Sequence, residues 1–190
     1  MEGDKQLAKK WIQGDEFNEQ LSILRKIVPE PWIGWLAGII DGEGTITITP
    51  RKRTDGTCKH EGFQVSVRVA NTDLAMIRKI EELTKRMIGS TGYVLERRPN
   101  RCKKQYYWMI ASRQALVLLK LVKPYLVTKS PQARIAIELQ ERISTRQGYN
   151  VPRISGGLKG STLTTDEYVI REKLFHEIKL LNVKGGDRYE

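Results

Sequence analysis

Two carboxylates, Asp41 and Glu43, follow an apolar segment, WIGWLAGII, at residues 32–40. The segment predicts a helix that begins at about Pro31, a residue well suited to a first helical turn. The C-terminal end of a helix is already negative, so two acids are unfavourable there unless a cation relieves the conflict. Mg²⁺, which takes one or two carboxylates together with substrate phosphates, suits such a position. The alternative is a buried helix that ends in a solvated Asp-Gly turn.

The same helix carries a stripe with almost no side chain, because Gly34 and Gly38 are four residues apart and Ala37 lies beside them. A glycine in a helix interior costs about 1 kcal/mol, so two of them call for a packing reason. Small residues let two helix backbones approach closely. Two copies packed about a two-fold axis would bring both Glu43 side chains together, as metal-assisted phosphodiester cleavage requires.

The chain is strongly basic, with a formal charge of +11 over 190 residues and a pI of about 9.7. This excess favours an anionic partner such as nucleic acid, anionic lipid or an acidic protein. No apolar run approaches the roughly 18 residues of a membrane-spanning helix, and no signal-peptide pattern opens the sequence. The two cysteines, Cys58 and Cys102, form no C-x-x-C pair. We therefore expect an intracellular protein of a reducing compartment, either cytoplasm, nucleoid or organelle.

Hydrophobic periodicity predicts the elements that position these residues. Helices are expected at 5–28, 31–44, 72–88, 115–122, 131–142 and 165–182, and strands at 45–49, 63–69, 93–98 and 105–111. Leu74 is assigned to the buried stripe of helix 72–88, Val169 to the apolar positions of the last helix, and Thr165 to the N-cap of that helix. The order predicts an α/β (α+β) fold with an antiparallel sheet covered by helices on one face. We divide the chain into an N-terminal helical extension (1–30), a core (31–145), and a basic loop with a C-terminal helix (146–190).

The predicted sheet has a polar face. If Ile46, Ile48 and the valines of strand 63–69 face the helices, the opposite face carries Thr45, Thr47, Thr49, Arg51, Arg53, Gln64, Ser66 and Arg68. The second hairpin would add Arg97, Arg101, Lys103 and Lys104, and also Tyr106 and Trp108 if the assumed parity of strand 105–111 is right. Such donors and acceptors suit base edges in a DNA major groove, which admits β-ribbons. Arg153 and Lys159 would contact phosphates. A solvated sheet face is the alternative.

The segment 36–44, LAGIIDGEG, resembles the motif that names the LAGLIDADG homing endonucleases. It differs by Ile39 for Leu, Gly42 for Ala and Glu43 for the second Asp. The αββαββα order expected over residues 31–142 is also that of the family, which has a saddle-shaped antiparallel sheet. The motif occurs once, which in this family implies a homodimer. Gly34, Ala37, Gly38 and Asp41 would then form the dimer interface.

The resemblance also implies roles for individual residues. Glu43 would bind the catalytic divalent metal, Mg²⁺ or another cation such as Mn²⁺, together with the backbone carbonyl of Gly42. Asn71 would position a water, and Lys129, which follows Pro124-Tyr125-Leu126, would balance charge at the scissile phosphate. The family's basic residue near the start of the following helix is not evident, and Arg78 is the nearest candidate.

Three functions are compatible with this resemblance. The leading one is a homodimeric endonuclease that cleaves both strands of a long pseudo-palindromic DNA site. The alternatives are an RNA-binding maturase that assists splicing of its own intron, and a DNA-binding regulator that does not cut. Glu43 favours cleavage over pure binding, whereas the sequence does not separate endonuclease from maturase. An intron-encoded gene would fit both.

Overall fold

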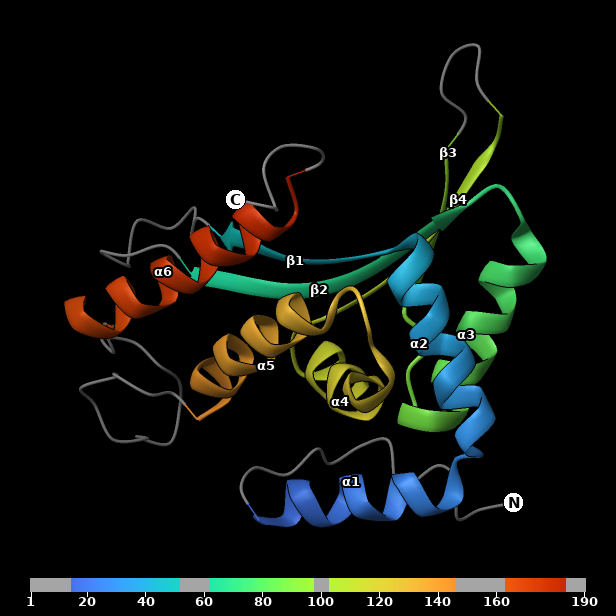
Figure 1. The fold of residues 1–190 in the computed structure, drawn as a ribbon, viewed down its shortest axis with the longest axis horizontal. Helices are drawn as coiled ribbons and strands as arrows, with labels where there is room; N and C mark the ends of the chain where they lie inside the picture. The colour runs from blue at the N-terminus through green and yellow to red at the C-terminus, as the bar shows by residue number, and fades with distance from the viewer. Residues whose placement is uncertain (1–14, 52–61, 98–102, 146–162, 184–190) are drawn as a thin grey trace, which may run out of the picture.

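The computed structural model of the chain describes residues 15–51, 62–97, 103–145 and 163–183 (Figure 1). The elements are α1 (Asp15–Ile27), α2 (Glu30–Glu43), β1 (Gly44–Arg51), β2 (Gly62–Asn71), α3 (Leu74–Ile88), β3 (Tyr93–Arg97), β4 (Gln105–Ala111), α4 (Ser112–Val122), the 3₁₀ turn η2 (Lys123–Tyr125), α5 (Ser130–Ser144) and α6 (Thr165–Leu181). The predicted αββαββα order from α2 onward is confirmed. Residues 5–14 of the first predicted helix lie outside the described residues.

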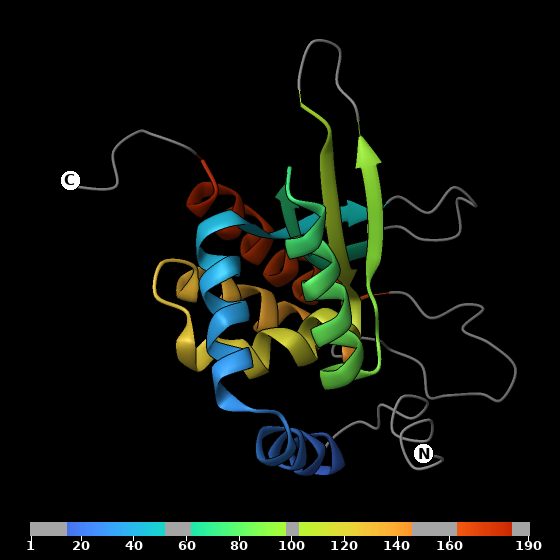
Figure 2. The same ribbon diagram turned by 90° about the vertical axis from the view of Figure 1, so that its right-hand side faces the viewer.

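The four strands form an antiparallel sheet in the order β1-β2-β4-β3. Alternation along β1 and β2 turns their apolar side chains to one face, where Ile46, Val65, Val67 and Val69 are fully buried. Helices α2, α3, α4 and α5 gather on that face, while the other face of the sheet is left open (Figures 1 and 2). The expected sheet with one helix-covered face is therefore confirmed.

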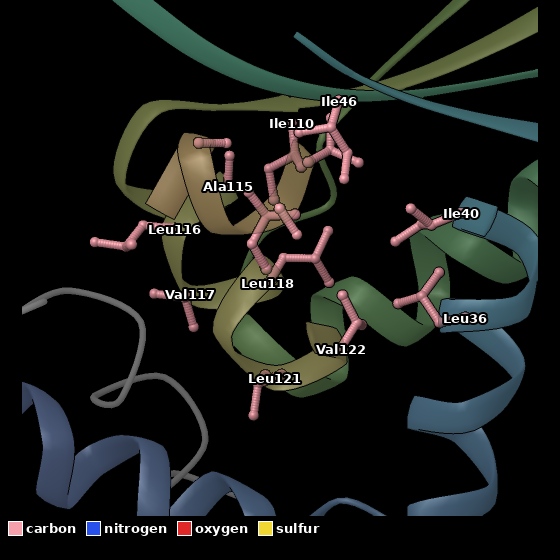
Figure 3. Packing of buried hydrophobic residues seen from close by; sticks show 14 of the residues in the cluster. Leu36, Ile40, Ile46, Ile110, Ala115, Leu116, Val117, Leu118, Leu121 and Val122 are labelled. Atoms are coloured by element: carbon pink, nitrogen blue, oxygen red, sulfur yellow. The ribbon is translucent and has the colours of Figure 1, made fainter. Parts of the chain in front are cut away.

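Helix α4 lies at the centre of the hydrophobic core, since nearly all of its apolar side chains are buried. Its residues Leu118 and Val122 point toward Leu36 and Ile40 of α2, and Ile46 and Ile110 approach from the sheet (Figure 3). Truncating one such leucine to alanine typically costs about 2–5 kcal/mol. This packing holds one side of α2 firmly, and with it the segment that ends in Asp41 and Glu43.

Three helix assignments differ from the sequence prediction. Leu74 is 38% exposed, because it opens α3 directly after the N-cap Asp73, whose carboxylate accepts from the backbone N–H groups of Ala75 and Met76. Val169 is 54% exposed. The N-cap of α6 is Thr164, one residue before the predicted Thr165.

Helix α6 buries two charged side chains, whereas its Val169 is exposed. Glu167 and Arg171 are 4% and 3% exposed and share the buried stripe with Leu174 and Ile178. The Glu167 carboxylate accepts from Arg171 Nε and from Arg142 Nη1 of α5, each at 2.9 Å. A buried carboxylate is tolerated only when it is paired in this way. None of the described helices is long and apolar enough to cross a membrane.

Candidate metal site and nucleic-acid interface

Helix α2 has a buried side and an open side. Leu36, Ala37 and Ile40 pack in the core, so the expectation that Ala37 lies at a dimer interface is wrong: its methyl group faces this chain's own interior. The open side carries Gly34, Gly38 and Gly42, and a Cβ added at any of these three would meet no atom of the residues that the structure describes within 4 Å. Below we call Gly34, Gly38 and Gly42 the glycine stripe.

Gly44 has a different role, because it lets the chain pass from α2 directly into β1. A Cβ at this position would lie 2.5 Å from the carbonyl oxygen of Ile40. The backbone N–H of Gly44 also donates to that carbonyl, which closes the last helical turn. Helix and strand are therefore joined without a loop, and Glu43 stands at the junction.

Asp41 is bound to the segment that leads into α5. Its carboxylate accepts from the backbone N–H of Val127 at 2.6 Å and of Lys129 at 2.9 Å, and from the Thr128 hydroxyl at 3.0 Å. Burial raises the pKa of Asp41, but these hydrogen bonds outweigh it and the pKa lies below its ordinary value. Asp41 was expected to hold a pair of helices together; in the structure its carboxylate holds residues 127–129 of its own chain.

Lys129, to which the resemblance assigns a role at the scissile phosphate, lies beside both acids. Its ammonium group donates to the backbone carbonyl of Asp41. Burial lowers the pKa of Lys129 below its ordinary value, while the nearby charges of Asp41 and Glu43 act in the opposite direction. A positive charge is thus fixed at the C-terminal end of α2.

Glu43 differs from Asp41 because it is exposed and makes no hydrogen bond or ion pair with the described residues. It stands in the last turn of α2, where carbonyl groups already concentrate negative charge. An unpartnered carboxylate beside an open glycine fits a divalent cation held by Glu43 and the carbonyl of Gly42. Within the described ranges, no group of three or more His, Cys, Asp or Glu side chains gathers to hold a metal.

Asn71 ends β2 at the same end of the sheet. The register pairs Gly44 with Val69, so Glu43 and Asn71 both lie just past this pair. The Asn71 carbonyl Oδ1 accepts from the backbone N–H of Asp73 at 2.9 Å, which fixes the side chain in a turn. Arg78 instead forms an ion pair with Glu81 at 2.6 Å on the exposed side of α3.

The open face of the sheet carries most of the polar residues expected there. Those within the described residues are Thr45, Thr47, Thr49, Arg51, Gln64, Ser66, Arg68 and Arg97. The hydroxyls of Thr47 and Ser66 are 2.9 Å apart, and Arg51 donates to the Gln64 amide oxygen. Arg68 is exposed and has no hydrogen bond or ion pair to the part of the chain that the structure describes. The candidates Arg53, Arg101, Arg153 and Lys159 lie outside the described residues.

The assumed parity of strand β4 is wrong. Trp108 is fully buried, and its Nε1 donates to the carbonyl of Thr91 at 2.9 Å. Tyr106 packs against the core on the same side. The open-face residues of β4 are instead Gln105, Tyr107 and Met109, which the sequence reasoning missed. In the segment QYYWMIA, both alternating sets of residues are largely apolar or aromatic, so the sequence does not show which set faces the core. The pairing of Met109 with the open-face residue Arg68 shows it.

Of the two remaining hairpin lysines, Lys103 is exposed. Lys104 forms an ion pair with Glu96 at 2.8 Å and lies over the ring of Tyr106. Charge on Lys104 is therefore partly neutralised within the hairpin, and Arg68 and Lys103 are freer to meet an anionic ligand.

Comparison with known proteins finds similarity in sequence and in fold. Residues 30–123 match the model of the LAGLIDADG-like domain. A search of curated protein sequences found no match. Among solved structures, homing endonuclease I-CvuI bound to its target has a TM-score of 0.58 at 20% identity, covering 92% of this chain and 89% of that one.

Two further structures are similar at comparable coverage. The archaeal intron-encoded homing endonuclease I-Vdi141I, complexed with DNA, has a TM-score of 0.61 at 15% identity and covers 83% of this chain and 88% of its own. The group I intron-encoded homing endonuclease I-CeuI, complexed with DNA, has a TM-score of 0.55 at 16% identity, with coverage of 98% and 87%. At these identities the likeness concerns the fold.

Proposed function

The chain belongs to the LAGLIDADG family, whose domain occupies residues 30–123, and we propose that it is a homodimeric, site-specific DNA endonuclease. It would hydrolyse both strands of a long, pseudo-palindromic target with the help of a divalent metal. The observation that carries this proposal is the exposed carboxylate of Glu43 at the end of α2, which makes no hydrogen bond or ion pair with the described residues. A carboxylate in this position has little purpose in a protein that only binds.

Glu43 and the Gly42 carbonyl would hold the metal, Mg²⁺ or another divalent cation such as Mn²⁺. When bound, the ion supplies Lewis-acid stabilisation at the phosphate and favours ionisation of an attacking water. Crystals of I-CvuI with DNA were obtained in the presence of calcium and of magnesium. In our chain Lys129 would place its ammonium against the scissile phosphate, and the Asn71 amide would position a water.

The glycine stripe supports the homodimer. One chain presents one free glutamate, and a closely packed second copy of α2 would add another about a two-fold axis. The stripe leaves room for such an approach, because no atom of the described residues lies within 4 Å of a Cβ placed there. Trp35, 39% exposed on the same helix, would be covered by the partner.

The open sheet face would bind the DNA duplex. It combines exposed Arg68 and Arg97 with threonine hydroxyls, and the whole chain carries a charge of +11. The related structures I-CvuI, I-Vdi141I and I-CeuI were each solved with DNA. A two-fold dimer presents this surface twice, which matches the symmetry of a pseudo-palindrome.

A selected-site cleavage assay tests the proposal. The full chain is incubated with a DNA library that contains a long randomised segment, with Mg²⁺ or with EDTA, and the cut ends are sequenced. We expect one family of near-palindromic sites, cut on both strands only when Mg²⁺ is present. Specific binding of an intron RNA without any DNA cutting would favour the maturase instead, and specific DNA binding without cutting would favour the regulator.

A further inference from the structure

The open face of the sheet changes chemistry along its length. The strand pairing groups its residues into cross-strand rows, because directly paired residues point to the same face. The row nearest Glu43 contains Ala70, Tyr107 and Leu95, and the next contains Thr45, Arg68, Met109 and Tyr93. The rows beyond contain Thr47 with Ser66 and Ala111, then Thr49 with Gln64, and then Arg51.

The two rows nearest Glu43 are largely apolar and accessible. Leu95 is 42% exposed and Tyr93 is 56% exposed, while Tyr107 and Met109 are half-buried. We call Tyr93, Leu95, Tyr107 and Met109 the apolar patch. The strand pairing places it on the face opposite the buried Trp108, and the ribbons of the helices lie to one side of the β3–β4 hairpin (Figure 2). Apart from the small, half-buried Ala111, the rows farther from Glu43 carry hydroxyl, amide and guanidinium groups.

Duplex DNA offers one apolar feature to such a patch. In the major groove each base pair presents donors and acceptors, and only thymine adds a methyl group. The patch shares a row with Arg68, whose exposed guanidinium would bind phosphates or guanine and favour binding of DNA to this surface. Arg97 lies over the ring of Tyr107, with 5.9 Å between its guanidinium carbon and the ring centroid, so positive charge borders the patch at its other end.

We propose that the apolar patch reads thymine methyl groups in the part of each half-site that lies nearest the cleavage position. The polar rows farther from Glu43 read the outer part through hydrogen bonds. This inference rests on the proposed function and specifies which bases that function prefers. Same-face rows are about 6.7 Å apart, close to two base-pair steps of about 3.4 Å. The two apolar rows therefore span about four base pairs in each half-site.

Methyl deletion on the DNA tests the proposal without altering the protein. In a duplex recovered from the selection, thymines are replaced one at a time by deoxyuridine, which lacks only the methyl group. Affinity is measured with calcium in place of magnesium. We expect thymine to be enriched in the four inner base pairs, and each contacted uracil to weaken binding roughly fourfold, as loss of one buried methyl-sized group does. Uracil in the outer part should have no such effect.

Two variants assign the effect to the patch. Leu95→Ala should bind the thymine duplex more weakly and abolish the difference between thymine and uracil; Leu95 is exposed, so this change leaves the core intact. Gln64→Ala on the same face is the matched control, and it should lower discrimination in the outer part while keeping the inner uracil effect.

Several outcomes would overturn the inference. A selected site with no inner thymine preference, or uracil effects that persist in Leu95→Ala, would refute it and leave the proposed endonuclease intact. Concentration-dependent self-association that Leu95→Ala abolishes would assign the patch to a protein partner. Failure to recover any bound or cut sequence would refute the proposed function as well.

Discussion

Replacing Gly38 by leucine should prevent dimer formation without harming the fold of a single chain. Within the described part of the chain, no atom lies within 4 Å of a Cβ placed at Gly38. Leucine is a better helix former than glycine by about 0.5–1 kcal/mol, so the isolated chain should become slightly more stable. In the dimer the added side chain would enter a close helix contact, where overpacking costs about 1–3 kcal/mol. Both copies carry the change, so the cost is about 2–6 kcal/mol, or at least roughly a thirtyfold rise in the dissociation constant.

Sedimentation velocity across a concentration series measures this effect, and urea unfolding checks the fold. Lys85→Leu, at an exposed position of α3, is the matched control and should remain dimeric. Gly44→Ala is the opposite control: its Cβ would meet the Ile40 carbonyl at 2.5 Å, so it should lower the free energy of unfolding. A Gly38→Leu protein that sediments as a normal dimer would refute the assignment of the glycine stripe to the interface.

Three further predictions concern the reading of DNA by Arg68, the hydrogen bonds of Asp41 and the buried ion pairs of α6. Arg68→Ala should relax sequence preference at one base pair, by about 1–3 kcal/mol if the guanidinium contacts guanine; equal weakening on every duplex would show a phosphate contact only. Asp41→Asn removes one of two accepting oxygens and should lower the free energy of unfolding by about 1 kcal/mol and slow cleavage, since Lys129 loses its support. An unchanged urea midpoint would contradict this. Glu167→Gln removes the buried carboxylate that Arg142 and Arg171 share and should cost about 3 kcal/mol in thermal unfolding. Glu177→Gln on the same helix serves as its control, and an equal melting temperature for the two variants would show that the buried ion pairs contribute nothing.

The elements that follow local rules were predictable from the sequence. Pro31 and the apolar run after it define α2, and the alternation of Ile46, Ile48, Val65 and Val67 defines the buried face of the sheet. The faces of strand β4 could not be predicted in this way, because both of its alternating sets of side chains are largely apolar. Which set lies toward the core depends on how β4 pairs with its partner strand. In α6, Glu167 and Arg171 occupy buried positions that a hydrophobic pattern assigns to solvent, because Arg142 of another helix completes their pairing.

The candidate site also contains some residues that the sequence identified and some contacts that it could not show. The family resemblance named Glu43 and Lys129 as candidates, and the structure places both near the end of α2. The use of Asp41 was not foreseeable, since its carboxylate binds residues 127–129, more than 80 positions along the chain. Ala37 looked like part of the glycine stripe by size alone, and only the packing of α2 on the core shows which side it faces.

The most direct test of the account is a comparison of wild type and Glu43→Gln on one selected DNA site. Glutamine keeps the size of the side chain and removes the charge that a metal needs, and Glu43 makes no hydrogen bond or ion pair with the described residues that the change would break. With Mg²⁺ present, we expect Glu43→Gln to bind the site within a few-fold of wild type and to leave both strands uncut. Undiminished cleavage by Glu43→Gln would contradict the claim that this carboxylate holds the metal.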